Sequence, residues 1–220
     1  MKHFVTGTDT GVGKTHVTAA LVTALRAQGR QARAIKPIET GWDQPTSDAA
    51  RLAAVSGQSI DQTIWLTLAA PRSPRSAAAL EGRTIDVAAL ARWCDAQDSD
   101  PLFVEGAGGW LVPITAGYRM RDLAVAIASS VVVVGRAGLG TVNHTLLTLE
   151  SIEQRAAITG TILSRLPSDD LEFARDNAAE IASATPSPVA IFPDDLVTIV
   201  GWFAGSFDDA PTHRGPRPAR

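Results

Sequence analysis

The segment Gly7-Thr8-Asp9-Thr10-Gly11-Val12-Gly13-Lys14-Thr15 has the residue types that bind phosphate. Its glycines allow successive backbone N–H groups, and the positive end of a following helix, to point at one anion. Lys14 could then reach the β- and γ-phosphates of a nucleoside triphosphate, and the Thr15 hydroxyl could bind Mg²⁺. Because Gly7 lies one position too early for the common G-x-x-x-x-G-K-[ST] pattern, this is a variant phosphate loop. The alternative is a glycine-rich turn between a strand and a helix, but Gly-Lys-Thr in this context favours nucleotide binding.

Three charged residues elsewhere in the chain could serve the same chemistry. Lys36 comes at the carboxyl end of an expected strand, the edge at which open α/β sheets bind ligands. Glu105 directly follows an apolar run and precedes a glycine-rich loop, a position typical of an acid that completes a Mg²⁺ shell. Asp48 follows Ser47, a helix N-cap residue. Taken alone, Lys36 could be a solvated surface lysine, and Asp48 could be a first-turn carboxylate that favours the helix dipole.

These residues need a scaffold, and the pattern of apolar segments predicts one. Short β-rich runs alternate with Ala- and Leu-rich helical stretches, which indicates βαβ units and a parallel sheet. The runs are nearly all apolar, as expected of strands covered on both faces. We therefore expect an α/β fold with a doubly wound, mostly parallel sheet, helices on both faces, and a P-loop of the deviant Walker A type. The expected strands are 3–6, 32–37, 102–104, 131–134, 161–163 and 189–191, and the expected helices are 15–28, 47–56, 85–94, 141–154 and 171–184.

Composition limits the other possibilities. With 220 residues and 45% hydrophobic content, we expect one domain over residues 1–207 and a disordered tail over residues 208–220, which are rich in Pro and Arg. A net charge of −3 without a basic stripe argues against a nucleic-acid partner. No apolar run approaches the roughly 20 residues that span a bilayer, so no membrane role is expected. The only cysteine, Cys94, and an N-terminus without a signal-peptide layout favour the cytoplasm.

The order of the motifs is more specific than any one of them. The segments GTDTGVGKT, KPIETG, SDAARL and VEGAGGWLVPI resemble the dethiobiotin synthetase family over residues 1–165. A fifth match, GLGTVNHTLLT at residues 138–148, lies in that family at a dimer interface, where it holds the tail of the substrate bound by the other subunit. On the residues alone, Asn143 and His144 could equally be a partly buried polar pair at a helix start.

The resemblance implies an activity and a set of roles. Such enzymes form the ureido ring of dethiobiotin from 7,8-diaminononanoate and CO₂, with ATP as co-substrate and Mg²⁺, and act as homodimers. Lys36 and Lys14 would be catalytic, and Thr15, Asp48 and Glu105 would organise the metal. Thr40 would bind the substrate, together with Gly140, Thr141 and Asn143. The nucleotide would contact Thr10, Gly11, Val12, Gly13, Lys14, Thr15, His16, Glu105, Gly106, Ala107, Gly108, Ser164 and Arg165.

Two segments depart from the family pattern. Ser164-Arg165 stands where an adenine-reading Asn-Asp pair is common, so the preference for ATP over other nucleotides is open. Ser73-Pro74-Arg75 lacks the histidine that relatives often carry after the proline, so no role is carried over to that loop.

Two rival functions share this type of phosphate loop. A MinD- or ParA-like switch ATPase would carry its signature lysine at position 9, which is Asp9 here. A glutamine-dependent amidoligase would need a nucleophilic cysteine, whereas Cys94 lies on an expected helix and resembles a packed core residue.

Overall fold

Six apolar segments form one parallel sheet within residues 1–43, 46–127 and 129–203, which the computed structural model describes. The strands of this sheet lie in the order β2-β5-β1-β6-β7-β8, and every neighbouring pair is parallel. Their bounds are β1 Lys2–Gly7, β2 Arg33–Ile35, β5 Leu102–Gly109, β6 Ser130–Arg136, β7 Ile158–Ser164 and β8 Val189–Phe192. The expected parallel sheet is confirmed.

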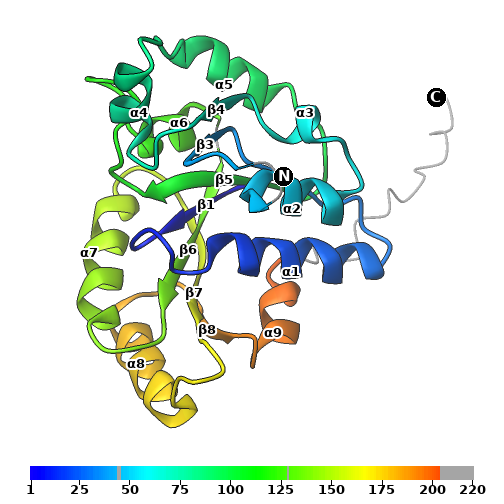
Figure 1. Cartoon of the computed structure of the whole chain (residues 1–220). Helices are drawn as coiled ribbons and strands as arrows, with labels where there is room; N and C mark the ends of the chain where they lie inside the picture. Colours follow the sequence, from blue (N-terminus) through cyan, green and yellow to red (C-terminus); the bar gives the residue numbers. More distant parts are fainter. Residues whose placement is uncertain (44–45, 128, 204–220) are drawn as a thin grey trace, which may run out of the picture.

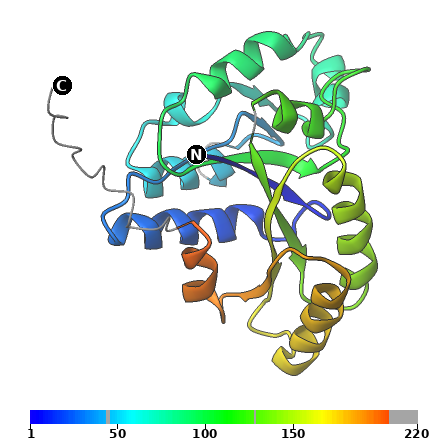
Figure 2. The same ribbon diagram turned by 180° about the vertical axis from the view of Figure 1, so that it is seen from behind.

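Helices cover both faces of this sheet because both faces are apolar. Along β6, Val131 and Val133 pack into one hydrophobic core, and Val132 and Val134 pack into the other. The helices α1 (Lys14–Ala27), α2 (Asp48–Ser56) and α9 (Leu196–Gly201) lie on the second side, as Figures 1 and 2 show. The first side carries α4 (Pro74–Leu80), α5 (Val87–Asp95), α6 (Met120–Ala126), α7 (Thr141–Glu153) and α8 (Leu171–Ala184). The doubly wound arrangement is therefore also confirmed.

The long helices begin and end where their capping residues indicate. Ser47 accepts a hydrogen bond from the backbone N–H of Ala50, and Gly57 ends α2 in the left-handed conformation with φ of 64°. The helices α1, α2, α5, α7 and α8 lie within two residues of the expected bounds. The short helices α3 (Ile60–Thr63), α4, α6 and α9 were not expected, because segments of four to seven residues are too short to show helical periodicity.

The strand predicted at residues 32–37 is too long. The expected strand 32–37 ends at Ile35, because the backbone N–H of Lys36 leaves the sheet and donates to the carbonyl oxygen of Thr63. The chain then forms β3 (Ile38–Thr40), which pairs with β4 (Leu66–Leu68) in a second, two-stranded parallel sheet.

Glu105 was expected directly after its strand, but it lies within β5. The glycines that follow it continue the pairing with β1 as far as the Gly7–Gly109 pair. Gly106 fits there because it has no side chain: a Cβ at this position would lie 2.9 Å from the Phe4 ring.

The expected tail at residues 208–220 lies outside the described residues. Among the residues that are described, no helix is long and apolar enough to cross a membrane.

Candidate active site

The strand order brings the charged residues together. Strand β5 lies between β1 and β2, so it is flanked by the phosphate loop after β1 and by Lys36 after β2. Ile35 is paired with Val104, and Val5 is paired with Glu105. Lys36 follows Ile35, just as Glu105 follows Val104 on the neighbouring strand. The two residues therefore lie side by side at the carboxyl end of the sheet, where open α/β sheets bind ligands.

Lys36 forms a buried ion pair with Glu105 that also includes Asp48. The Lys36 Nζ lies 2.6 Å from Glu105 Oε1 and 3.0 Å from Asp48 Oδ2. The Thr15 hydroxyl donates to the same Glu105 oxygen at 2.7 Å. Lys36 is 4% exposed and Glu105 is 0% exposed. The surface-lysine interpretation of Lys36 is therefore wrong.

The two acids keep Lys36 charged in spite of its burial. Burial alone would lower the pKa of Lys36, but the charges of Glu105 and Asp48 and their hydrogen bonds outweigh it and raise that pKa above its ordinary value. Burial would likewise raise the pKa of Asp48, but Lys36 and the Thr15 hydroxyl lower it overall. Lys36 is thus an ammonium at neutral pH, held between the side chains of Glu105 and Asp48.

Lys14 lies at the start of α1 with its amine over the phosphate loop. Its Nζ donates to the carbonyl oxygen of Asp9 at 3.4 Å. Burial, and to a lesser degree the charge of Lys36, lower the pKa of Lys14 to about 8. A buried cation that shares its surroundings with a second cation is stabilised by an anion, so this end of the loop is electrostatically suited to phosphate.

A cavity of about 320 Å³ lies above this cluster and is called the phosphate cavity below. It brings together most of the site residues expected from sequence, and it adds Glu39 and Arg51, to which the sequence had assigned no role. It is lined by Thr10, Gly11, Gly13, Lys14, Thr15, His16, Lys36, Glu39, Thr40, Asp48, Arg51, Ala107 and Gly108. Gly106 instead packs against Phe4.

A second cavity of about 330 Å³, called the nucleoside cavity below, also borders the phosphate loop. Ser164 faces it and packs so closely on Gly13 that a Cβ there would lie 2.5 Å from the Ser164 hydroxyl oxygen. Arg165 instead forms a bidentate ion pair with Asp194, at 2.9 and 3.0 Å. The remaining lining residues are Gly11, Val12, His16, Arg136, Gly138, Leu166 and Asp169.

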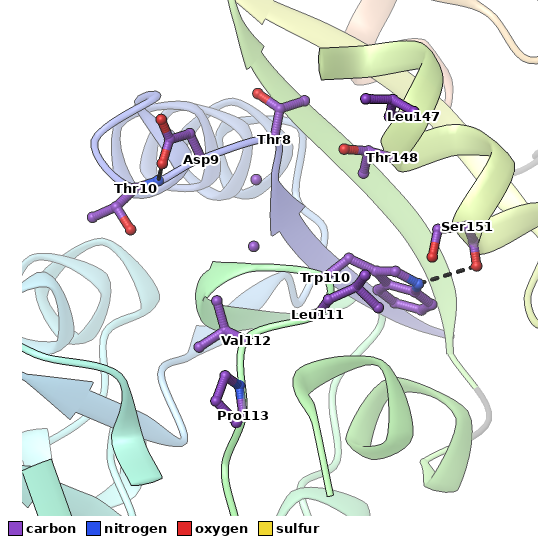
Figure 3. A pocket seen from close by; sticks show the side chains of 12 residues that line it. Thr8, Asp9, Thr10, Trp110, Leu111, Val112, Pro113, Leu147, Thr148 and Ser151 are labelled. Carbon is purple, nitrogen blue, oxygen red and sulfur yellow. Dashed lines mark hydrogen bonds between the residues drawn. The ribbon is translucent and has the colours of Figure 1, made fainter. Parts of the chain in front are cut away.

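A third cavity, of about 460 Å³, opens between the phosphate loop, the end of β5 and α7 (Figure 3) and is called the apolar cavity below. One wall consists of Trp110, Leu111, Val112, Pro113 and Leu147, and the Trp110 indole N–H donates to the carbonyl oxygen of Ser151 at 3.2 Å. Thr8, Asp9, Thr10, Thr148 and Ser151 provide polar groups around it. Sequence reasoning assigned no role to the apolar wall, although the WLVP run that supplies most of it directly follows the EGAGG loop.

The fifth motif lies apart from the charged cluster within one chain. Gly140 precedes α7 with φ of 87°, and Thr141 is buried at the helix start. Asn143 is exposed, as is His144, so the interpretation as a partly buried polar pair is wrong. None of these residues is among those that line the phosphate cavity.

The donor set of the cluster fits Mg²⁺. The second carboxylate oxygen of Glu105, Oε2, is buried and has no hydrogen-bond partner among the described residues. An orphaned carboxylate oxygen beside a hydroxyl and a second carboxylate is suited to a hard cation or its bound water. No group of three His, Cys, Asp or Glu side chains in the described chain could hold a metal alone. The cation would therefore need the Thr15 hydroxyl and the oxygens of a bound nucleotide.

The sheet order, the phosphate loop after β1 and the acid on the adjacent strand define a P-loop nucleotide-binding protein. A family model described as "AAA domain" matches residues 2–197. The MinC:MinD cell division protein complex of Aquifex aeolicus resembles the chain with a TM-score of 0.51 and 19% identity, covering 91% of this chain and 84% of that one. This likeness shows the fold alone.

Similarity to curated proteins narrows the class to one family. The chain is 47% identical to the ATP-dependent dethiobiotin synthetase of Anaeromyxobacter dehalogenans, over 86% of this chain and 88% of that protein. It is 37% identical to the ATP-dependent dethiobiotin synthetase of Haloferax mediterranei, over 86% and 82% of the two chains. The chain belongs to the dethiobiotin synthetase family of ligases.

The buried ion pair predicts a specific pattern of stability. Glu105→Gln removes the nearest counter-charge of Lys36 and should lower the free energy of unfolding by about 3 kcal/mol, since one charge of a buried pair remains. Glu105→Gln combined with Lys36→Met should lower the free energy of unfolding by less than Glu105→Gln alone, because it leaves no buried ammonium whose remaining counter-charge is the partly exposed Asp48. Urea denaturation of both variants and the parent measures this. If the free energy of unfolding of Glu105→Gln lies within about 0.5 kcal/mol of the parent value, the range of ordinary surface substitutions, the prediction is contradicted. Water would then already solvate the pair.

Proposed function

We propose that this protein is an ATP- and Mg²⁺-dependent ligase that closes the ureido ring of dethiobiotin from 7,8-diaminononanoate and CO₂. The observation that carries the proposal is Lys36, a buried ammonium held at 2.6 Å from Glu105 and 3.0 Å from Asp48 at the edge of the phosphate cavity. The relatives named above, which are ATP-dependent dethiobiotin synthetases, support it.

The proposed reaction has three steps. One substrate amine attacks CO₂ and loses a proton, which gives a carbamate. A carbamate oxygen then attacks the γ-phosphorus of ATP, ADP leaves, and a carbamic-phosphoric anhydride forms. Finally the second amine attacks the carbonyl carbon, loses a proton and displaces phosphate, which closes the ring. Each step changes the charge on oxygen atoms, so cations and N–H groups fixed in place before reaction should provide much of the catalysis.

The two lysines would serve as these fixed cations. Because its pKa is raised, Lys36 stays protonated at neutral pH and would stabilise charge on the carbamate and the γ-phosphate instead of accepting a proton. Lys14 and the backbone of residues 10–16 would hold the β- and γ-phosphates. Thr40, which also lines the phosphate cavity, would hydrogen-bond the substrate.

Thr15, Asp48 and Glu105 would hold Mg²⁺, which when bound neutralises charge on the phosphate oxygens. The orphaned Glu105 Oε2 and the lowered pKa of Asp48 support this set of ligands.

The apolar cavity would receive the aliphatic chain of the substrate. Its wall of Trp110, Leu111, Val112, Pro113 and Leu147 offers apolar surface beside Thr10, which also lines the phosphate cavity. We propose that Gly140, Thr141 and Asn143 bind the substrate tail across a homodimer. Gly140 and Asn143 are exposed at the start of α7, and later turns of this helix line the cavity.

We further propose that residues 1–207 act as one ligase domain in the cytoplasm. The two hydrophobic cores on one sheet support the first point, and the buried free thiol of Cys94 is compatible with the second.

A nucleotide-switch ATPase is the weaker alternative. Its signature lysine would stand at position 9, but Asp9 accepts a hydrogen bond from Arg136 at 3.0 Å. An acid in an ion pair there cannot supply the missing cation.

The direct test is an assay with 7,8-diaminononanoate, bicarbonate, Mg²⁺ and ATP. We expect dethiobiotin and phosphate in equal amounts, measured by mass spectrometry and a phosphate assay. Phosphate release at the same rate with and without the diamine would favour the switch ATPase and contradict the proposal.

Base selectivity should be relaxed in this enzyme. Ser164 lacks the amide that reads adenine, and all three guanidinium nitrogens of Arg165 donate within the chain, to Asp194, Leu166 and Asp169. A lost bidentate contact removes about 1–3 kcal/mol of discrimination between bases. We expect CTP or GTP to support turnover within about tenfold of ATP, which corresponds to about 1.4 kcal/mol.

Comparison of kcat/KM for the four triphosphates measures this selectivity. The matched variant Ser164→Asn restores the amide and should raise the preference for ATP. A preference for ATP well beyond about a hundredfold in the parent enzyme would contradict the expectation, and would indicate that the backbone of residues 192–194 reads adenine.

A further inference from the structure

Glu39 is a buried acid that binds the first turn of helix α2. It lies on β3 between Lys36 and Thr40 and is 7% exposed. Its Oε1 accepts the backbone N–H of Asp48 at 2.9 Å, and its Oε2 accepts the backbone N–H of Ala49 at 2.9 Å. Both carboxylate oxygens are thus bound to the first two N–H groups of the helix.

Glu39 binds two N–H groups of this helix that the N-cap side chain does not bind. The N-cap residue Ser47 already accepts the Ala50 N–H at 3.0 Å, which is the ordinary capping bond. A buried carboxylate is costly unless it is hydrogen-bonded, and both oxygens of Glu39 accept a backbone N–H. Ser47 and Glu39 thus bind different N–H groups of the first turn, and Glu39 ties that turn to strand β3.

The helix residue that Glu39 fixes is Asp48, whose carboxylate reaches Lys36. The backbone N–H of Asp48 is bound by Glu39, and its Oδ2 lies 3.0 Å from the Lys36 Nζ. Glu39 precedes Thr40 on the same strand, and both line the phosphate cavity. The Glu39 side chain thus links β3, which carries the proposed substrate-binding residue Thr40, to the proposed metal ligand Asp48.

We propose that Glu39 is a positioning residue that holds the Asp48 carboxylate in place for the metal and for Lys36. The inference rests on the proposed function, because it takes Asp48 as a metal ligand. Glu39 itself acts through α2, with both of its oxygens turned to backbone N–H groups. Residues that orient metal ligands typically change metal affinity by 10–100-fold when they are replaced.

The test is Glu39→Gln, which keeps the shape of the side chain. Since Glu39 uses one oxygen for each N–H group, the amide must lose one of the two bonds and place an NH₂ group against a backbone N–H. With a non-hydrolysable ATP analogue bound, we expect the Kd of Mn²⁺ to rise about tenfold, measured from the electron paramagnetic resonance signal of free Mn²⁺. Binding of the analogue without metal should stay within about twofold of the parent.

Asp86 provides a matched control on the nine-residue helix α5. Its carboxylate also accepts two backbone N–H groups, those of Ala88 and Ala89, but away from the site. Asp86→Ala should lower Tm to a similar extent as Glu39→Gln and leave the Mn²⁺ affinity unchanged. Asp48→Asn should weaken Mn²⁺ binding, and adding Glu39→Gln to it should cause little further loss.

The outcomes separate this inference from the proposed function. If Glu39→Gln lowers Tm while the Kd of Mn²⁺ stays at the parental value, Glu39 is only a helix cap and the inference is overturned. An equal loss of Mn²⁺ affinity in Asp86→Ala would overturn it as well. A third outcome concerns the parent protein with the analogue bound. If its Kd for Mn²⁺ is no lower than that of the analogue alone, both this inference and the proposed metal site are overturned.

Discussion

The ion pair between Lys36 and Glu105 is the interaction on which the rest of the site depends. Glu105 is completely buried, and a carboxylate in that position requires a counter-charge. Lys36 supplies it because β2 and β5 are parallel and in register, so that two residues far apart in sequence meet at one sheet edge. Asp48 and Thr15 then complete the cluster. The same arrangement leaves a second Glu105 oxygen without a partner among the described residues, beside the cavity where phosphate would bind.

Much of this could be predicted from the sequence, because the strongest signals are local. Nearly uniform apolar runs predicted the parallel strands, and a glycine-rich loop before Lys14 predicted the phosphate loop. The small sheet of β3 and β4 was missed, since strands of three residues carry too little periodicity. Glu39 was missed for a different reason. Its two bonds go to backbone N–H groups nine and ten residues away, and no residue type marks such a contact in advance.

The nucleoside side of the site shows where family resemblance stops being informative. Arg165 follows Ser164 at the end of β7, and the resemblance assigned both to the nucleotide. In the structure only Ser164 faces the nucleoside cavity, because Asp194 draws the Arg165 guanidinium away. That pairing joins two loops at neighbouring strand ends, β7 and β8, and only the folded chain reveals it. The proposed chemistry therefore rests on the phosphate end of the site, where the cluster of charges is built into the sheet.

If Lys36 serves phosphoryl transfer and not nucleotide binding, Lys36→Ala must change kcat and leave nucleotide affinity intact. Removing a preorganised cation or donor of this kind typically lowers kcat by about 10²–10³-fold. We expect a fall of at least a hundredfold in kcat, with the Kd of a non-hydrolysable ATP analogue within about twofold of the parent and circular dichroism showing that the variant is folded. A kcat equal to that of the parent, or a loss that appears only in the Kd, would contradict this account of the site.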